Sequence, residues 1–138
     1  MKKAHMRGLI VAGLIVTGVA AVPAQGRKVG EPVSFKKDIA PLIGRRCLPC
    51  HAEDNFNPSE LSLDSYEKLM EGGKHGSPVV PGKAHESIII KKTSTIPPFG
   101  ERMPLNPRKK VEEGTAKWLT DPELRLLAVW INQGAKDN

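Results

Sequence analysis

The pentapeptide Cys47-Leu48-Pro49-Cys50-His51 holds both cysteines of this 138-residue chain and a histidine directly after the second one. A CxxCH pattern is typical of covalent haem attachment. The two thiols form thioether bonds to the vinyl groups of one porphyrin, and the histidine lies under the iron as its proximal ligand. The sequence therefore predicts one haem c, attached at Cys47 and Cys50, with His51 as an iron ligand.

Three other interpretations of the cysteine pair stay open. A local disulfide would close a very small loop and would restrict little chain entropy. A redox dithiol would fit Cys-Leu-Pro-Cys, but no alternating strand and helix pattern surrounds it. A zinc site could recruit His75 or His85, yet the second ligand pair at the spacing of structural zinc is absent from the sequence. We therefore expect no zinc.

A haem that only transfers electrons needs a second axial ligand. The side chains on offer are Met70, Met103, His75 and His85. Met103 stands among prolines, in a stretch without the helical apolar pattern that would explain a methionine by packing. Met70 is expected in the core, and both histidines are expected at the surface. We predict Met103 as the distal ligand; a core position for Met103 and bis-histidine ligation are the alternatives.

The N-terminus has the pattern of an export signal. Basic residues precede an apolar run from Gly8 to Val22, which is short for a membrane span. We predict a signal peptide at residues 1–24, a flexible leader at 25–32 and one domain at 33–138. Periplasmic or otherwise exported localisation follows, with an uncleaved N-terminal membrane anchor as the alternative.

Apolar spacing and capping residues predict a small all-α fold with long Gly/Pro-rich loops. A short first helix should run from near Ala40 towards Cys47, and a second should end at Gly72-Gly73. Lys83 to Lys92 favours a third helix, although its three isoleucines could also suit a strand. The last helix is the best marked, since Thr120 and Glu123 predict a capping box and Gly134 an end.

The charge of +6 is partly due to the export signal, because removing residues 1–24 leaves 18 basic and 15 acidic side chains. Basic clusters remain at Lys91-Lys92 and Arg108-Lys109-Lys110. No aromatic residues interleave with these clusters, as a base-stacking surface would require, so nucleic acid is excluded as a partner. The clusters indicate a solvated basic face or a steering patch for an acidic redox partner.

Eight segments of the sequence form one pattern over roughly Val33 to Ala135. They are Phe35 to Leu42, Cys47 to His51, Leu61 to Tyr66, Gly72-Gly73, Val80-Pro81-Gly82, Glu86-Ser87, Met103-Pro104 and Trp130 to Ala135. Together these segments resemble the planctomycete-type cytochrome c domain, a relative of class I cytochromes c. The resemblance implies Met103 as distal ligand and a first and last helix packed over the haem, with Leu42 and Ile43 meeting Leu127 and Ile131. Two features depart from it: Ala52 replaces the usual glycine, and Leu105 to Leu119 is long.

We expect an electron carrier and not an enzyme, with redox proteins as partners. Two alternatives are a haem-bearing subunit of a larger periplasmic or membrane oxidoreductase and a small-molecule-binding haem enzyme or sensor. For a carrier or a haem-bearing subunit, any substrate chemistry would belong to a separate polypeptide. The sequence leaves the electron donor and acceptor and the oligomeric state open. It also leaves the reduction potential open, because burial of the haem and hydrogen bonds to its ligands set that potential.

Overall fold

The computed structural model describes residues 30–48 and 50–138. The predicted signal peptide and residues 25–29 of the leader lie outside this range. Within it, secondary structure is helical, and the one β-type pairing is an isolated bridge between Gly73 and Gly76, which confirms the all-α class. In chain order the elements are the π-helix η1 (Phe35–Ile39), α1 (Ala40–Arg46), α2 (Tyr66–Glu71), the 3-10 helix η2 (Ala84–Glu86), α3 (Ile88–Thr93), α4 (Arg108–Glu112) and α5 (Asp121–Asn132).

The first helix starts earlier than its sequence predicts, because a π-helical turn precedes α1. The Ser34 hydroxyl oxygen accepts a hydrogen bond from the first turn of η1, and the Asp38 carboxylate accepts one from the Ser34 N–H at 2.9 Å. These two bonds satisfy donors that a helix start leaves without intrahelical partners. Pro41 is tolerated because it stands in the first turn of α1.

The second helix, α2, ends at Gly72 as predicted. Gly72 has a φ of +83°, and a Cβ there would collide with the carbonyl of Gly76, so only glycine suits this turn. The predicted third helix is divided into η2 and α3 at Ser87. The buried Ser87 hydroxyl accepts from the Val80 N–H at 2.9 Å and donates to the Lys83 carbonyl at 3.0 Å, which holds its backbone extended. The three isoleucines that follow are helical.

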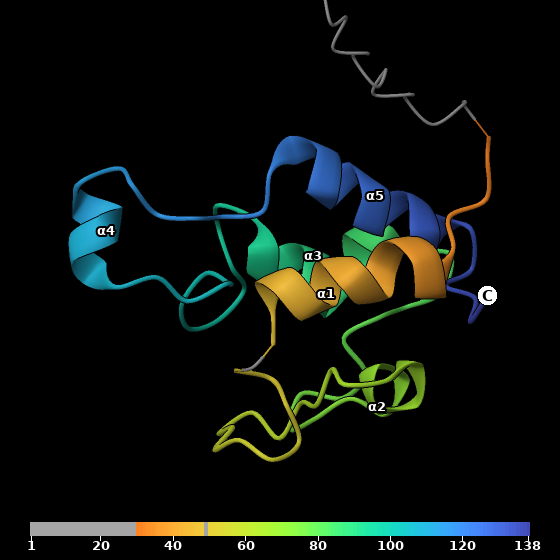
Figure 1. The fold of residues 1–138 in the computed structure, drawn as a ribbon, viewed down its shortest axis with the longest axis horizontal. Coiled ribbons are helices and arrows are strands. Elements are labelled where there is room, and N and C mark those ends of the chain that lie inside the picture. Colours follow the sequence, from red (N-terminus) through yellow and green to blue (C-terminus); the bar gives the residue numbers. More distant parts are fainter. Residues whose placement is uncertain (1–29, 49) are drawn as a thin grey trace, which may run out of the picture.

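A five-residue helix that was not predicted from the sequence, α4, lies in the long stretch from Leu105 to Leu119. All its residues are exposed, and an Arg108–Glu112 ion pair at 2.8 Å stabilises its one turn. In Figure 1 the segment carrying α4 extends away from the other helices. The capping box of α5 is present as predicted, between Thr120 and Glu123.

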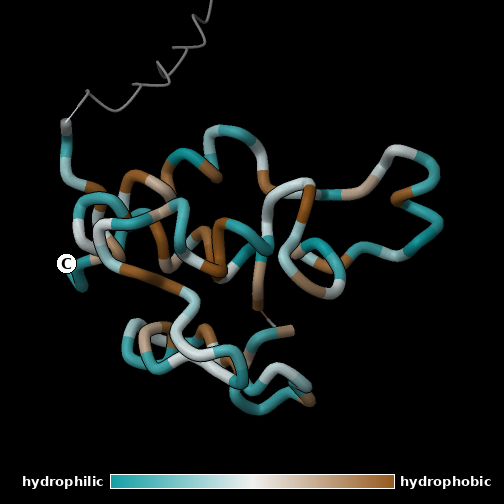
Figure 2. Tube along the Cα trace, turned by 180° about the vertical axis from the view of Figure 1, so that it is seen from behind, coloured by the Kyte–Doolittle hydropathy of each residue, from teal (hydrophilic) through white to brown (hydrophobic). Residues whose placement is uncertain are grey.

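The elements η1, α1, η2, α3 and α5 form what we call the helical body, in which α5 contacts η1, η2 and α3. Trp130 is fully buried at the centre of this body. Its ring centroid lies 5.6 Å from that of Phe35, and the Phe35 centroid lies 5.2 Å from that of Tyr66. Figure 1 shows α2 and its loops beside this body, and Figure 2 shows that those loops and the α4 segment are mainly hydrophilic. The residues expected to join the first and last helices are all buried in this one core: Leu42, Ile43, Leu127 and Ile131.

Two polar contacts fix the direction in which α5 runs past η1 and α1. Arg46, at the end of α1, pairs with Glu123 in the first turn of α5 through two hydrogen bonds of 2.8 and 2.9 Å. The Lys36 N–H, at the start of η1, donates to the carbonyl of Asn138 at 3.0 Å. The two helical segments therefore run in opposite directions. No helix among the described residues is long and apolar enough to cross a membrane.

Candidate haem-binding site

Cys47, Cys50 and His51 come together in one turn at the end of α1. The Cys47 N–H still donates to the Ile43 carbonyl at 2.8 Å, so Cys47 caps the helix, and the His51 N–H donates to the Cys47 carbonyl at 3.1 Å. Cys47 is half-buried against the core and Cys50 is exposed, both as free cysteines. Pro49 lies outside the described residues. The turn therefore offers two thiols and one imidazole from five consecutive residues.

Burial raises the pKa of the Cys47 thiol to about 11, although the neighbouring Arg46 lowers it in part. Cys47 is thus a neutral thiol at neutral pH. A redox dithiol depends on the opposite effect, a lowered pKa that keeps its nucleophilic cysteine as the thiolate. The raised pKa of Cys47 therefore argues against thiol–disulfide exchange at this cysteine.

The imidazole of His51 is oriented by the backbone that precedes α2. Its Nδ1 lies 3.1 Å from the carbonyl oxygen of Leu61, and the Leu63 N–H donates to the His51 carbonyl at 2.8 Å. A carbonyl only accepts, so Nδ1 carries the proton and Nε2 keeps its lone pair. A ring nitrogen that donates to a carbonyl in this way is the usual orientation of a metal-ligating histidine. The donor set of this turn therefore fits a haem iron on the Nε2 side.

Met103 lies in the loop that follows α3 and is half-buried. Its N–H donates to the carbonyl of Lys92, the penultimate residue of α3, at 2.8 Å, and its peptide bond to Pro104 is cis. Within the described part of the chain, no hydrogen bond links this loop to the turn from Cys47 to His51. The candidate ligands thus come from two separate segments, each anchored to the helical body by backbone hydrogen bonds.

The other ligand candidates occupy the positions that the sequence predicts for them. Met70 packs against the core from α2. His75 is exposed, with its ring 4.3 Å from that of Phe99, and His85 is exposed at 83% of its side chain. Sequence reasoning missed the Leu61 carbonyl as the partner of His51. No sequence pattern could have pointed to this carbonyl, because every residue carries one.

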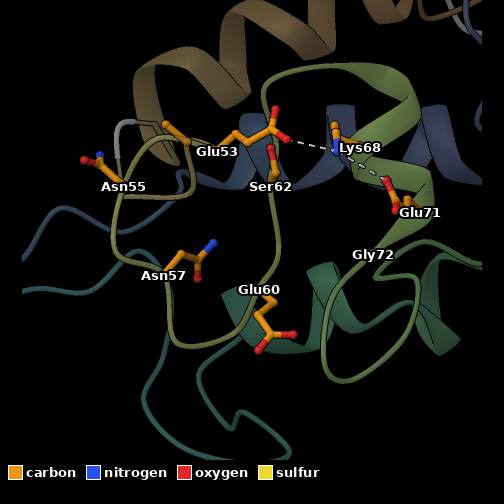
Figure 3. A pocket seen from close by; sticks show the side chains of 9 residues that line it. Glu53, Asn55, Asn57, Glu60, Ser62, Lys68, Glu71 and Gly72 are labelled. Atoms are coloured by element: carbon orange, nitrogen blue, oxygen red, sulfur yellow. Dashed lines mark ion pairs between the residues drawn. The ribbon is translucent and has the colours of Figure 1, made fainter.

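A surface hollow of 250 Å³ lies beside α2, and none of the four candidate site residues lines it. Figure 3 shows Lys68 between Glu53 and Glu71, with ammonium-to-carboxylate distances of 3.1 and 3.7 Å. These charges already pair with one another, and the other lining side chains, among them Asn55, are mostly polar. The hollow therefore does not suit a porphyrin, whose faces are apolar.

The family described as Planctomycete cytochrome C matches residues 47–104. The match begins at the first cysteine of CxxCH and ends at the proline after Met103, so it covers both candidate segments and α2 to α3 between them. It is shorter than the resemblance seen in the sequence, since η1, α1 and α5 lie largely outside it. It nevertheless assigns this part of the chain to a haem-binding family.

Among characterised proteins, the chain is similar to the alpha subunit of hydrazine synthase from Kuenenia stuttgartiensis, at 27% identity over an alignment 143 positions long. The alignment covers 87% of this chain but only 17% of that subunit. No solved structure gives a significant match to the chain. From the CxxCH turn to the Met-Pro pair, residues 47–104 are a planctomycete-type cytochrome c domain.

Proposed function

We propose that this protein is an exported cytochrome c with a single haem that passes single electrons between redox proteins. Cys47 and Cys50 form the thioether bonds, His51 is the proximal ligand and Met103 the distal ligand. The observation that carries the proposal is the Nδ1 contact of His51 with the Leu61 carbonyl, in a turn that also presents two free cysteines. The haem itself supplies the chemistry, a reversible one-electron change at iron.

The chain's own residues hold and shield that group. The Leu61 carbonyl fixes the tautomer of His51, so that the Nε2 lone pair would be available to bind the haem iron. The end of α3 fixes the backbone of Met103. Two axial ligands from the protein leave no iron position for a substrate, so we expect no catalysis by this chain.

We assign the whole of residues 33–138 to the cytochrome c domain, beyond the stretch that the family match covers. Buried core residues begin at Val33 and end at Ala135. The C-terminal residue Asn138 also binds Ser34 and Phe35 through hydrogen bonds of 2.6 and 2.8 Å. A core that closes on both ends in this way behaves as one folding unit.

Covalent attachment is tested by extraction with acidified acetone from protein made in a haem-attaching host. We expect the pigment to stay on the polypeptide, and Cys47→Ala/Cys50→Ala to lose it completely. The single variant Cys47→Ala should keep one thioether bond, and its absorption spectrum should be shifted from that of the wild type. Pigment that extracts from the wild type would rule out thioether bonds.

Axial ligation is tested by comparing Met103→Ala with Met70→Ala. Met103→Ala should lose the weak charge-transfer band between methionine sulfur and iron and should bind carbon monoxide when reduced. Met70→Ala should keep the band, because Met70 packs in the core. If wild-type protein binds carbon monoxide readily, a small-molecule-binding haem protein becomes the better description.

A second candidate function is a haem-bearing subunit of a larger periplasmic oxidoreductase. It is favoured by the similarity to the alpha subunit of hydrazine synthase, although this chain aligns with only 17% of that subunit. Purification from the native host under mild conditions distinguishes the two functions. A shuttle should elute at the size of the single chain, and a permanent subunit should co-elute with its enzyme.

A further inference from the structure

The loop that carries Met103 is attached to the last two residues of α3. The Lys92 carbonyl accepts from the Met103 N–H at 2.8 Å, and the Thr93 carbonyl accepts from Nε of Arg102 at 3.1 Å. The last carbonyls of a helix have no intrahelical donor. Two consecutive loop residues, Arg102 and Met103, supply the donors that the end of α3 lacks.

The Lys92 side chain closes the same loop from its other side. Its ammonium donates to the carbonyls of Phe99 and Glu101 at 2.7 and 2.5 Å, and it lies 4.8 Å from the Phe99 ring centroid. An exposed lysine normally leaves its ammonium in water, because fixing the side chain costs rotamer entropy. Here one residue holds the loop at three points: its carbonyl binds Met103, and its ammonium binds two residues before it.

Arg102 joins this loop to the chain that returns from α4. Its guanidinium carbon lies 4.3 Å from the ring centroid of Trp118, a stacked cation–π contact. Nε of the same guanidinium binds Thr93, so Arg102 bridges α3 and the segment before α5. Arg102 and Met103 are therefore held from both sides of the sequence: Lys92, which precedes them, binds Met103, and Trp118, which follows them, contacts Arg102.

We propose that Lys92 and Arg102 are positioning residues for the Met103 ligand. The proposal rests on the function proposed above. A thioether is a weak ligand for iron, so how long it stays bound depends on how firmly its loop is held. Loss of either side chain frees the loop, and an added ligand then replaces the sulfur more readily.

The test is cyanide binding to oxidised haem protein in Lys92→Met and Lys91→Met. The two substitutions remove the same charge from adjacent residues, but Lys91 is exposed and its side chain does not enter the loop. Lys92→Met should bind cyanide roughly tenfold faster than the wild type. Lys91→Met should stay within about twofold of it. The reduction potential should fall further in Lys92→Met, because methionine ligation raises it.

Arg102→Lys provides the second variant, with Arg108→Lys in α4 as its control. Both keep the charge and both lose an Nε donor, but only Arg102→Lys loses a donor to α3 and the cation–π contact with Trp118. Faster cyanide binding in Arg102→Lys alone supports the proposal, even if Lys92→Met does not accumulate. Equal rates within each pair overturn it. Met103→Ala separates the two proposals: if it binds cyanide no faster than the wild type, the ligand assignment itself is wrong.

Discussion

The helical body and the two segments attached to it, residues 50–65 and 94–119, are stabilised in different ways. The body buries Trp130, Ile39 and Ile131 completely. The attached segments leave large apolar side chains in solvent, including Phe56 at 93% and Ile96 at 85% exposure. Apolar burial therefore holds the body, whereas the segments bury few apolar side chains, such as Leu63 and Leu119, and are held mainly by hydrogen bonds from backbone and side-chain donors. Both proposed iron ligands belong to the segments, next to their attachment points.

Removing one large aromatic side chain from the body and one from an attached segment should show this difference most clearly. Trp130→Ala removes the central side chain of the body and its hydrogen bond to the Lys136 carbonyl. We expect it to lower the free energy of unfolding by about 3–5 kcal/mol. Phe56→Ala should lower it by less than about 0.5 kcal/mol, since its ring is exposed. Urea unfolding of the haem-loaded proteins measures both, and a large loss in Phe56→Ala would contradict the comparison.

Two serine-to-alanine variants, one in the body and one in an attached segment, should show a smaller difference in stability. Ser87→Ala leaves the partly buried Val80 N–H without its acceptor, the hydroxyl of the fully buried Ser87. The expected loss in the free energy of unfolding is about 1–3 kcal/mol. Ser94→Ala removes a hydroxyl that donates to the carbonyls of Lys91 and Ile96 in the attached segment. Water can replace that donor, so the loss should be smaller; thermal unfolding of the two variants side by side decides it.

The ion pair between α1 and α5 should give a smaller effect that depends on pH. Arg46 donates to Glu123 and thereby lowers the pKa of that carboxyl, with burial acting in the other direction. The pair therefore stabilises the folded state above the ordinary pKa of glutamate, and this is lost as pH falls through the lowered value. Glu123→Gln should lower the free energy of unfolding by about 1 kcal/mol at neutral pH.

Glutamine can still serve the capping box with Thr120, so this variant removes the charge and keeps the cap. The difference between Glu123→Gln and the wild type should vanish in acid. Denaturant unfolding across the acid range measures it, and a difference that persists at low pH would point to packing in place of charge.

Charge steering should give the smallest effect. Residues 91–119 carry seven basic and three acidic side chains, whereas residues 50–75 carry two basic and six acidic. Lys110→Glu should slow oxidation of the reduced haem by ferricyanide, an anion, and weaken its dependence on ionic strength. Lys74→Glu makes the same charge change in the acidic stretch and should slow it less. Stopped-flow rates at several salt concentrations test this, and equal slowing would leave only net charge as the cause.

Short-range patterns in the sequence predicted the parts of the fold that depend on neighbouring residues. The capping box of α5 needs only Thr120 and Glu123, three positions apart, and Gly72 ends α2 because its φ suits glycine alone. The π-helical turn before α1 and the division at Ser87 were not predicted. Both depend on a side chain that could equally have pointed to solvent: the Asp38 carboxylate accepts from the Ser34 N–H, and the Ser87 hydroxyl accepts from the Val80 N–H.

The CxxCH turn and the all-α class were determined by the sequence itself, because each depends on residue types at fixed local spacing. The orientation of His51 and the attachment of Met103 were decided only by tertiary structure. Their partners are the carbonyls of Leu61 and Lys92, ten and eleven residues away along the chain. Every residue carries a carbonyl, so no side-chain pattern distinguishes the two that are used. The path of the folded backbone makes that selection.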